Sequence, residues 1–224
     1  MHDHTIDPAD EGRHEFGAEQ FWNESYYFDF HREDGSLGGY VRIGLHPNMG
    51  VTWYWATLVG EGRPLVTLID HQAPIPEPGS LDLQHGDMKA YHRCEVPTRR
   101  FALGVEGTAQ AFQDPARIYE TLQGEPTPLQ FDLEWETDGP GGYRFRDMDR
   151  YEISCHVKGR IRVGDEEIDF AGHGQRDHSW GNRDWWTTVW CWNAGWLEDG
   201  TRFHSVEPLT LDGQNMPWAA GYVQ

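Results

Sequence analysis

A polar segment between glycines holds the side chains of this sequence that are best suited to chemistry. It runs from Gly172 to Trp186 and reads Gly-His-Gly-Gln-Arg-Asp-His-Ser-Trp-Gly-Asn-Arg-Asp-Trp-Trp, with Arg176, Asp177 and His178 in succession. Charged side chains are costly to bury unless they are paired, so one interpretation is a structural plug in which Asp177 or Asp184 accepts an arginine. The other is a cluster of acid, base and donor at the mouth of a cavity.

Indole side chains follow this segment along a predicted strand. Its residues on one face are Trp186, Trp190, Trp192 and Trp196, and two further aromatic stripes are Val51, Trp53 and Trp55, and Trp22, Tyr26, Phe28 and Phe30. Each indole is large and carries an N–H that needs a partner. One interpretation is an aromatic core. The other is a pocket for a long apolar or isoprenoid ligand, in which ring faces stabilise a developing carbocation.

Strands must position these residues, because apolar side chains alternate with polar ones along most of the chain. We predict strands at Trp22–His31, Gly39–His46, Val51–Val59, Leu65–Asp70, Lys89–Cys94, Phe101–Val105, Leu129–Trp135, Tyr151–Val157, Glu167–Ala171, Trp186–Trp196, Arg202–Glu207 and Trp218–Val223. Strands with one polar and one apolar face are typical of antiparallel sheets, and many short ones favour an all-β barrel or sandwich. Asp114–Gly124 is the predicted helix, with Asp114 as its cap. The glycines at 172, 174 and 181 are expected to allow tight backbone with positive φ.

Charge and composition exclude several classes of partner. The 224 residues include 18 Lys and Arg against 37 Asp and Glu, which gives a net charge of −19. Such a charge argues against nucleic acid or an anionic membrane surface as a partner. A run of eighteen apolar residues, which a membrane span needs, does not occur, and no signal peptide is visible, so we expect a cytoplasmic protein. The three cysteines form no Cys-x-x-Cys pair and are expected to be reduced.

Metals and nucleotides are not expected as cofactors. The start of the chain, residues 1–15, is polar and predicted to be mobile, so that His2, His4 and His14 would bind metal only adventitiously. The other histidines are scattered and show no metal-binding spacing. Gly172-His-Gly174 is followed by Gln-Arg-Asp where a dinucleotide fingerprint requires a helix.

Arg176-Asp-His-Ser-Trp-Gly181 matches the Asp-His-x-Trp-Gly signature of the AttH and carotenoid 1,2-hydratase superfamily of lipocalin-like proteins. The early Phe21-Trp-Asn-Glu-Ser-Tyr-Tyr-Phe28 is also similar to members of this group. The resemblance implies two lipocalin-like β-barrel domains in tandem. On this basis we expect a mobile tail at 1–15, a first domain at 16–185, and at 186–224 the start of a second domain that is incomplete in this chain.

The resemblance also implies a function and the residues that perform it. Members include cofactor-free hydratases of isoprenoid double bonds and lipid-handling proteins without catalysis. On the hydratase pattern, His178 and Trp180 correspond to pocket residues, and Ser205-Val206-Glu207 is the nearest counterpart of a Tyr-x-acid pair on a later strand. The oligomeric state is left open.

An acid in a poorly hydrated aromatic pocket has a raised pKa, so Asp177 or Glu207 could protonate an alkene or a tertiary hydroxyl. His178 would position or deprotonate water. The rings of Trp180, Trp190 and Trp192 would stabilise the cation. The sequence therefore predicts a hydratase or dehydratase of a hydrophobic isoprenoid or lipid. The alternative is a non-catalytic carrier of such a ligand, in which Arg176, Asp177 and His178 only lock the rim of the barrel.

Overall fold

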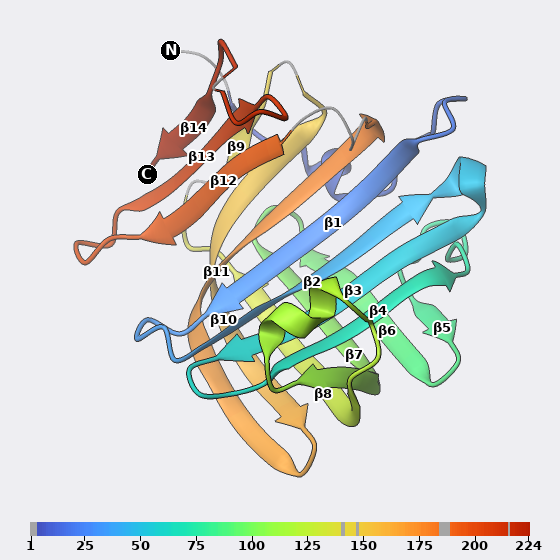
Figure 1. The fold of residues 1–224 in the computed structure, drawn as a ribbon. Coiled ribbons are helices and arrows are strands. Elements are labelled where there is room, and N and C mark those ends of the chain that lie inside the picture. Colours follow the sequence, from blue (N-terminus) through green and yellow to red (C-terminus); the bar gives the residue numbers. More distant parts are fainter. Residues whose placement is uncertain (1–3, 140–141, 147, 184–188, 215) are drawn as a thin grey trace.

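The computed structural model describes residues 4–139, 142–146, 148–183, 189–214 and 216–224, and antiparallel β-structure dominates them (Figure 1). The strands are β1 Trp22–His31, β2 Leu37–His46, β3 Val51–Gly60, β4 Leu65–Ala73, β5 Leu83–His85, β6 Met88–Val96, β7 Arg100–Phe112, β8 Glu125–Glu136, β9 Tyr143–Arg144, β10 Arg150–Val163, β11 Glu166–Asn182, β12 Val189–Trp196, β13 Arg202–Leu209 and β14 Ala220–Val223. The predicted all-β class is confirmed. In the described part of the chain, no helix is long and apolar enough to cross a membrane.

Most of the strands form one large sheet that nearly closes into a ring. Their order is β4-β3-β2-β1-β11-β10-β8-β7-β6-β5, β9 pairs with β10, and β4 also pairs with β7. This closing contact joins Leu65–Thr67 to residues 110–112, so the ring has almost no free edge. The strands β12, β13 and β14 make a small second sheet, drawn in red beside the ends of β9, β10 and β11 (Figure 1).

The interior of the ring is packed with aromatic side chains. Along β1, alternation sends Tyr26, Phe28 and Phe30 inwards, where each is 1% exposed. Phe28 contacts Phe101 and Trp135 at ring-centroid distances of 4.8 and 5.3 Å. The indole Nε1 of Trp135 donates to the carbonyl of Asp29 at 2.7 Å, which satisfies its polar atom in the core. One predicted aromatic stripe is therefore core rather than a pocket wall.

The predicted helix at Asp114–Gly124 is reduced to the 3₁₀ turn η3, Pro115–Tyr119. Asp114 does cap it, because its carboxylate accepts from the N–H of Ala116 at 3.0 Å. Leu122, which an amphipathic helix over this range would bury, is 54% exposed. Without an apolar face against the ring, the packing contacts that sustain a longer helix are missing.

The N-terminal segment, residues 4–15, packs onto the ring, which differs from the mobile tail that the sequence predicts. Its 3₁₀ turn η1, Pro8–Glu11, is capped by Asp7, and Ile6 and Glu11 are buried. The physical reason is charge pairing: the carboxylate of Glu11 lies against the buried guanidinium of Arg176. The expected boundary at 185/186 falls among residues 184–188, outside the described residues.

The glycine-rich segment from residue 172 to 182 is the second half of strand β11, not a loop between strands. Of its three glycines, only Gly181 has a positive φ, at 112°. A Cβ at Gly172 or Gly174 would lie 2.2 or 2.1 Å from the carbonyl oxygen of His31 or Asp29. These two glycines therefore allow close approach of β1 rather than a left-handed turn.

Candidate active site

Successive residues of β11 point to opposite faces of the ring. His178 lies opposite Tyr26 in the antiparallel register with β1, whereas Asp177 lies opposite Tyr27. Tyr26 faces the interior, so His178 does too, and Asp177 faces outwards beneath the small sheet. The structure therefore separates the predicted acid from the predicted base. Arg176 and Trp180 are each two residues from His178 along the strand, so both share the inner face with it.

A cavity of about 520 Å³ lies on the outer face, between the ring and the small sheet. Four of the predicted site residues line it: Asp177, Trp55, Trp190 and Trp192. The wall also includes polar side chains that were not predicted from the sequence as site residues, namely Ser25, Tyr27, Arg42, Arg150, Ser179, Asn182 and Arg183. The volume and the mixture of rings with a few polar groups are typical of sites for small organic ligands.

Asp177 is the acid of this cavity. It is 8% exposed, and its Oδ2 accepts a hydrogen bond from Arg150 at 2.9 Å. Burial raises the pKa of Asp177 to about 6, although the charge of Arg150 opposes this rise. A carboxyl group with such a pKa can both donate and accept a proton near neutral pH.

Arg150 connects Asp177 to a second buried carboxylate, that of Glu152. The guanidinium Nε of Arg150 donates to Glu152 at 2.7 Å. Glu152 also accepts from Gln175 at 2.9 Å and from the indole Nε1 of Trp192 at 3.2 Å. These hydrogen bonds orient Asp177 and fix one indole of the cavity wall, so the polar base of the cavity is held together by strands β10, β11 and β12.

An aromatic groove continues from this cavity across the outer face of β3. A second cavity, of about 540 Å³, shares Arg42 and Trp55 with the first and is also lined by Trp53 and His71. The guanidinium carbon of Arg42 lies 4.6 Å from the ring centre of Trp55, and burial lowers the pKa of Arg42 to about 10. The indole N–H of Trp55 donates to His71 at 2.9 Å. Trp53, a predicted ligand-binding residue, therefore belongs to the neighbouring cavity.

Other predicted site residues lie away from the first cavity. Glu207 pairs with Cys191 in the small sheet, and its neighbour Val206 is the residue that lines the cavity. Because successive strand residues alternate, Glu207 faces away from Asp177. Trp180 lies on the inner face against His14, with ring centres 3.7 Å apart. Trp186 lies outside the described residues.

Arg176 takes part in a buried ion pair on the inner face. Its guanidinium donates two hydrogen bonds to Glu11, at 2.7 and 2.9 Å, and Tyr151 donates a third to the same carboxylate at 2.7 Å. Burial alone would raise the pKa of Glu11, but the charge and hydrogen bonds of Arg176 lower it overall. This arrangement matches the structural-plug interpretation, with Glu11 in the place that was expected for Asp177 or Asp184.

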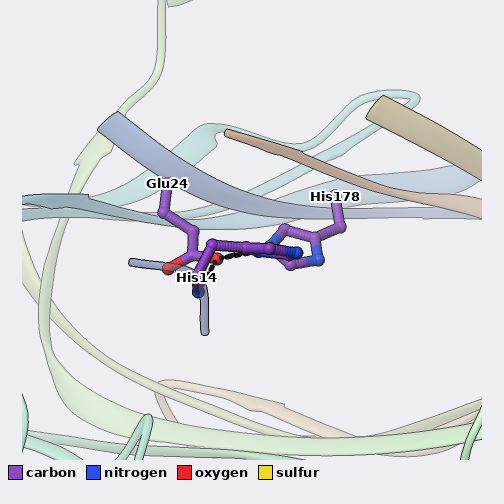
Figure 2. A group of neighbouring side chains, drawn as sticks. All are labelled: His14, Glu24 and His178. Atoms are coloured by element: carbon purple, nitrogen blue, oxygen red, sulfur yellow. Dashed lines mark hydrogen bonds and ion pairs between the residues drawn. The ribbon is translucent and has the colours of Figure 1, made fainter. Parts of the chain in front are cut away.

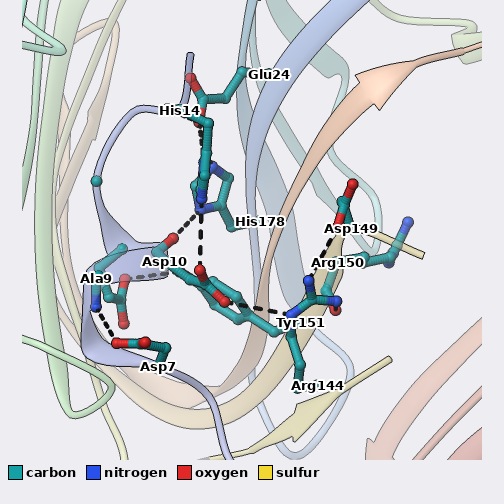
Figure 3. A network of polar contacts seen from close by, with 12 residues as sticks. Asp7, Ala9, Asp10, His14, Glu24, Arg144, Asp149, Arg150, Tyr151 and His178 are labelled. Carbon is teal, nitrogen blue, oxygen red and sulfur yellow. Dashed lines mark hydrogen bonds and ion pairs between the residues drawn. The ribbon is translucent and has the colours of Figure 1, made fainter. Parts of the chain in front are cut away.

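His178 contacts Asp10 of the N-terminal segment and Glu24 of strand β1 (Figure 3). Its Nδ1 lies 2.7 Å from the carbonyl oxygen of Asp10, and its Nε2 lies 3.1 Å from Glu24. His14 contacts the same oxygen of Glu24 at 2.7 Å. His178 therefore binds the N-terminal segment and strand β1 and does not line the outer cavity.

Comparison with solved structures gives several matches. A crystal structure of an AttH candidate from Nitrosomonas europaea, at 2.00 Å resolution, matches with a TM-score of 0.63 and 16% identity over 99% of this chain and 69% of that one. CghA matches at 12% identity over 91% of this chain and 58% of its own, with TM-scores of 0.48 alone and 0.49 with Sch210972. Curated protein sequences give no significant match.

The predicted resemblance to AttH proteins is confirmed for the fold. The family comparison covers almost the whole sequence, including the N-terminal segment from Asp7 onwards and both sheets. On this match over residues 7–224, the chain belongs to the family described as Domain of unknown function (DUF7064).

Proposed function

We propose that this protein is an enzyme that hydrates or dehydrates a hydrophobic, isoprenoid- or lipid-like molecule in the outer cavity by acid–base chemistry. The observation that carries the proposal is the position of Asp177, whose pKa is raised to about 6, in a cavity walled by Trp55, Trp190 and Trp192. This chemistry needs two groups: an acid that titrates near neutral pH, and aromatic faces that attract cations.

The reaction can be written with the residues of the cavity alone. Protonated Asp177 gives its proton to an alkene carbon, which leaves a carbocation, or to a tertiary hydroxyl, which leaves as water. The faces of the cavity indoles stabilise the cation. In hydration, water adds to the cation and its surplus proton returns to the Asp177 carboxylate; in dehydration, that carboxylate takes a proton from the neighbouring carbon. The acid is thus restored in both directions.

The remaining wall residues support binding of a molecule with one polar end. Tyr27 and Arg42 supply a hydroxyl and a cation to the cavity, and the groove past Trp53 offers an apolar extension. Arg150 acts as a positioning residue, because it holds the Asp177 carboxylate through the hydrogen bond at 2.9 Å.

The test replaces Asp177 with asparagine, which keeps the size and an acceptor for Arg150 but removes the proton. The candidate substrate is identified by mass spectrometry of a lipid extract from the purified protein. We expect the parent to convert it and D177N to lose at least about 100-fold in rate. The control is D169N: Asp169 is on the same strand, and its side chain is 95% exposed. An unchanged rate in D177N would refute the role of Asp177.

A carrier is the second candidate function, and one contact favours it. Arg150 donates hydrogen bonds to both Asp177 and Glu152, so these carboxylates could serve only to pair with Arg150 at the base of the cavity and take no part in proton transfer. Quenching of tryptophan fluorescence measures binding independently of turnover. Binding that survives in D177N, with no product from the parent protein, would support the carrier.

A further inference from the structure

Three side chains with metal-binding atoms meet on the inner face of the ring (Figure 2). His14 comes from the N-terminal segment, Glu24 from β1 and His178 from β11. Their ligand atoms all lie within 4.8 Å of one another. Glu24 and His178 are each 1% exposed, whereas His14 is half-buried at the rim. We call these residues the His14–Glu24–His178 cluster.

The contacts of His178 place the lone pair of its Nε2 against a carboxylate oxygen of Glu24, so that two hydrogen-bond acceptors face each other. Its Nδ1 lies 2.7 Å from the carbonyl oxygen of Asp10, which can only accept, so Nδ1 carries a proton. In the neutral ring, Nε2 then has a lone pair, and this lone pair faces a carboxylate oxygen of Glu24 at 3.1 Å. Such a contact needs a positive charge between the two atoms or on the ring, from a second proton or from a metal ion.

Asp10 lies near the far nitrogen of both histidines. Its carbonyl oxygen accepts from His178, and its carboxylate lies 3.6 Å from Nε2 of His14 (Figure 3). The nitrogens that remain, Nε2 of His178 and Nδ1 of His14, are the two that approach Glu24. Histidines that bind metals are typically held in this way, with the other ring N–H on a carbonyl or a carboxylate.

Aromatic neighbours fix the orientation of both rings. His14 stacks on Trp180 with 3.7 Å between centres and 10° between planes. His178 stacks on Tyr26 with 3.8 Å between centres and 16° between planes. Rings held by stacking and by Asp10 lose little further freedom when an ion binds, which favours binding.

We propose that the His14–Glu24–His178 cluster binds one divalent transition-metal ion of the Zn²⁺ type. Two imidazole nitrogens and one carboxylate are a donor set that suits zinc, whereas Mg²⁺ and Ca²⁺ prefer oxygen alone. The ion links the N-terminal segment to β1 and β11 and so fastens the segment that carries Glu11. This site lies on the opposite face of β11 from Asp177, and the proposal does not depend on the proposed function.

No metal is predicted from the sequence, because residues 1–15 are expected to be mobile and the other histidines show no metal-binding spacing. His14 is 10 residues from Glu24, and Glu24 is 154 residues from His178. Only the pairing of β1 with β11 and the folding of the N-terminal segment bring them together.

The test is calorimetric titration of the EDTA-treated protein with ZnCl₂, followed by titration with CoCl₂ and visible absorption spectroscopy. We expect one ion per chain, a higher Tm with zinc, and affinity that falls as the pH is lowered and the histidines take up protons. MgCl₂ should give none of these effects. His14→Asn, at the partly exposed ligand, and Glu24→Gln should each weaken zinc binding by at least about 10-fold. Circular dichroism verifies that both variants are folded.

A matched control separates the cluster from chelation by other histidines near the chain start. The double variant His2→Ala/His4→Ala should bind zinc as the parent does. Loss of binding in this control, with binding retained in His14→Asn, would overturn the proposal. The absence of stoichiometric zinc binding to the parent would also overturn it. In that case the contact between His178 and Glu24 would be a buried ion pair with a doubly protonated ring.

Discussion

The ion pair between Arg176 and Glu11 should contribute more to stability than any single exposed contact. The two side chains are 2% and 3% exposed, and two charge-assisted hydrogen bonds join them. The substitution Glu11→Gln keeps the shape but leaves the buried guanidinium without its counter-charge. Removing one partner of a buried pair costs about 3–5 kcal/mol, a large part of the 5–15 kcal/mol that typically stabilises a domain.

Urea unfolding followed by tryptophan fluorescence measures this loss, and the matched control is Glu166→Gln. Glu166 also forms a two-point pair, with Arg63 at 2.6 Å for both bonds, but its side chains are 34% and 47% exposed. That substitution should cost only about 0–1 kcal/mol. Equal losses in the two variants would refute the argument that burial makes the Glu11 pair important.

The same pair sets a dependence on pH. The folded protein lowers the pKa of Glu11, so its contribution is present above the unfolded value of 4.5 and is lost as the pH falls through the folded pKa. The parent and Glu11→Gln should therefore converge in stability in acid. A difference that stays constant from neutral pH into acid would contradict this assignment.

Two further substitutions test the packing of β1 against β11. Burial raises the pKa of Asp29 to about 7, so the folded state binds this proton more tightly than the unfolded state does, and stability falls as the pH rises from about 4 to 7. D29N should remove this fall and be more stable than the parent at pH 8 by up to about 4 kcal/mol, whereas the control D169N should not. Urea unfolding at about pH 4 and at pH 8 measures both effects. Gly174→Ala places a Cβ 2.1 Å from the carbonyl oxygen of Asp29 and should cost about 1–3 kcal/mol, whereas Gly12→Ala, with 3.5 Å to its nearest atom, should change the midpoint little.

The sequence predicts strands best where buried residues alternate with more exposed ones. The predicted bounds Trp22–His31 agree with β1, in which the buried Tyr26, Phe28 and Phe30 alternate with less buried residues. Between residues 174 and 180 strand β11 is buried on both faces, and its charged side chains are paired by distant residues. Without a polar face there is no alternation to recognise, so the sequence resembles a loop there.

The composition of the cavity could be predicted only in part. The residue type alone marked the tryptophans as candidates for a ligand pocket, and Trp55, Trp190 and Trp192 do line the cavity, as does Asp177. Arg150 was not selected, because only the pairing of β10 with β11 places it beside Asp177. The partner of Arg176 is still less predictable, since Glu11 lies 165 residues away in a segment that looks disordered by composition.

The Asp-His pair of the signature serves two sites, because neighbouring strand residues face opposite sides of a sheet. Arg176, His178 and Trp180 contact the N-terminal segment on the inner face, and Asp177 alone of these faces the cavity. A relative that kept the inner three residues but replaced Asp177 would still hold the N-terminal segment against the inner face. It would lack the acid on which the proposed reaction depends. The signature therefore indicates the fold, and on the proposed function the residue at position 177 would distinguish an enzyme from a carrier.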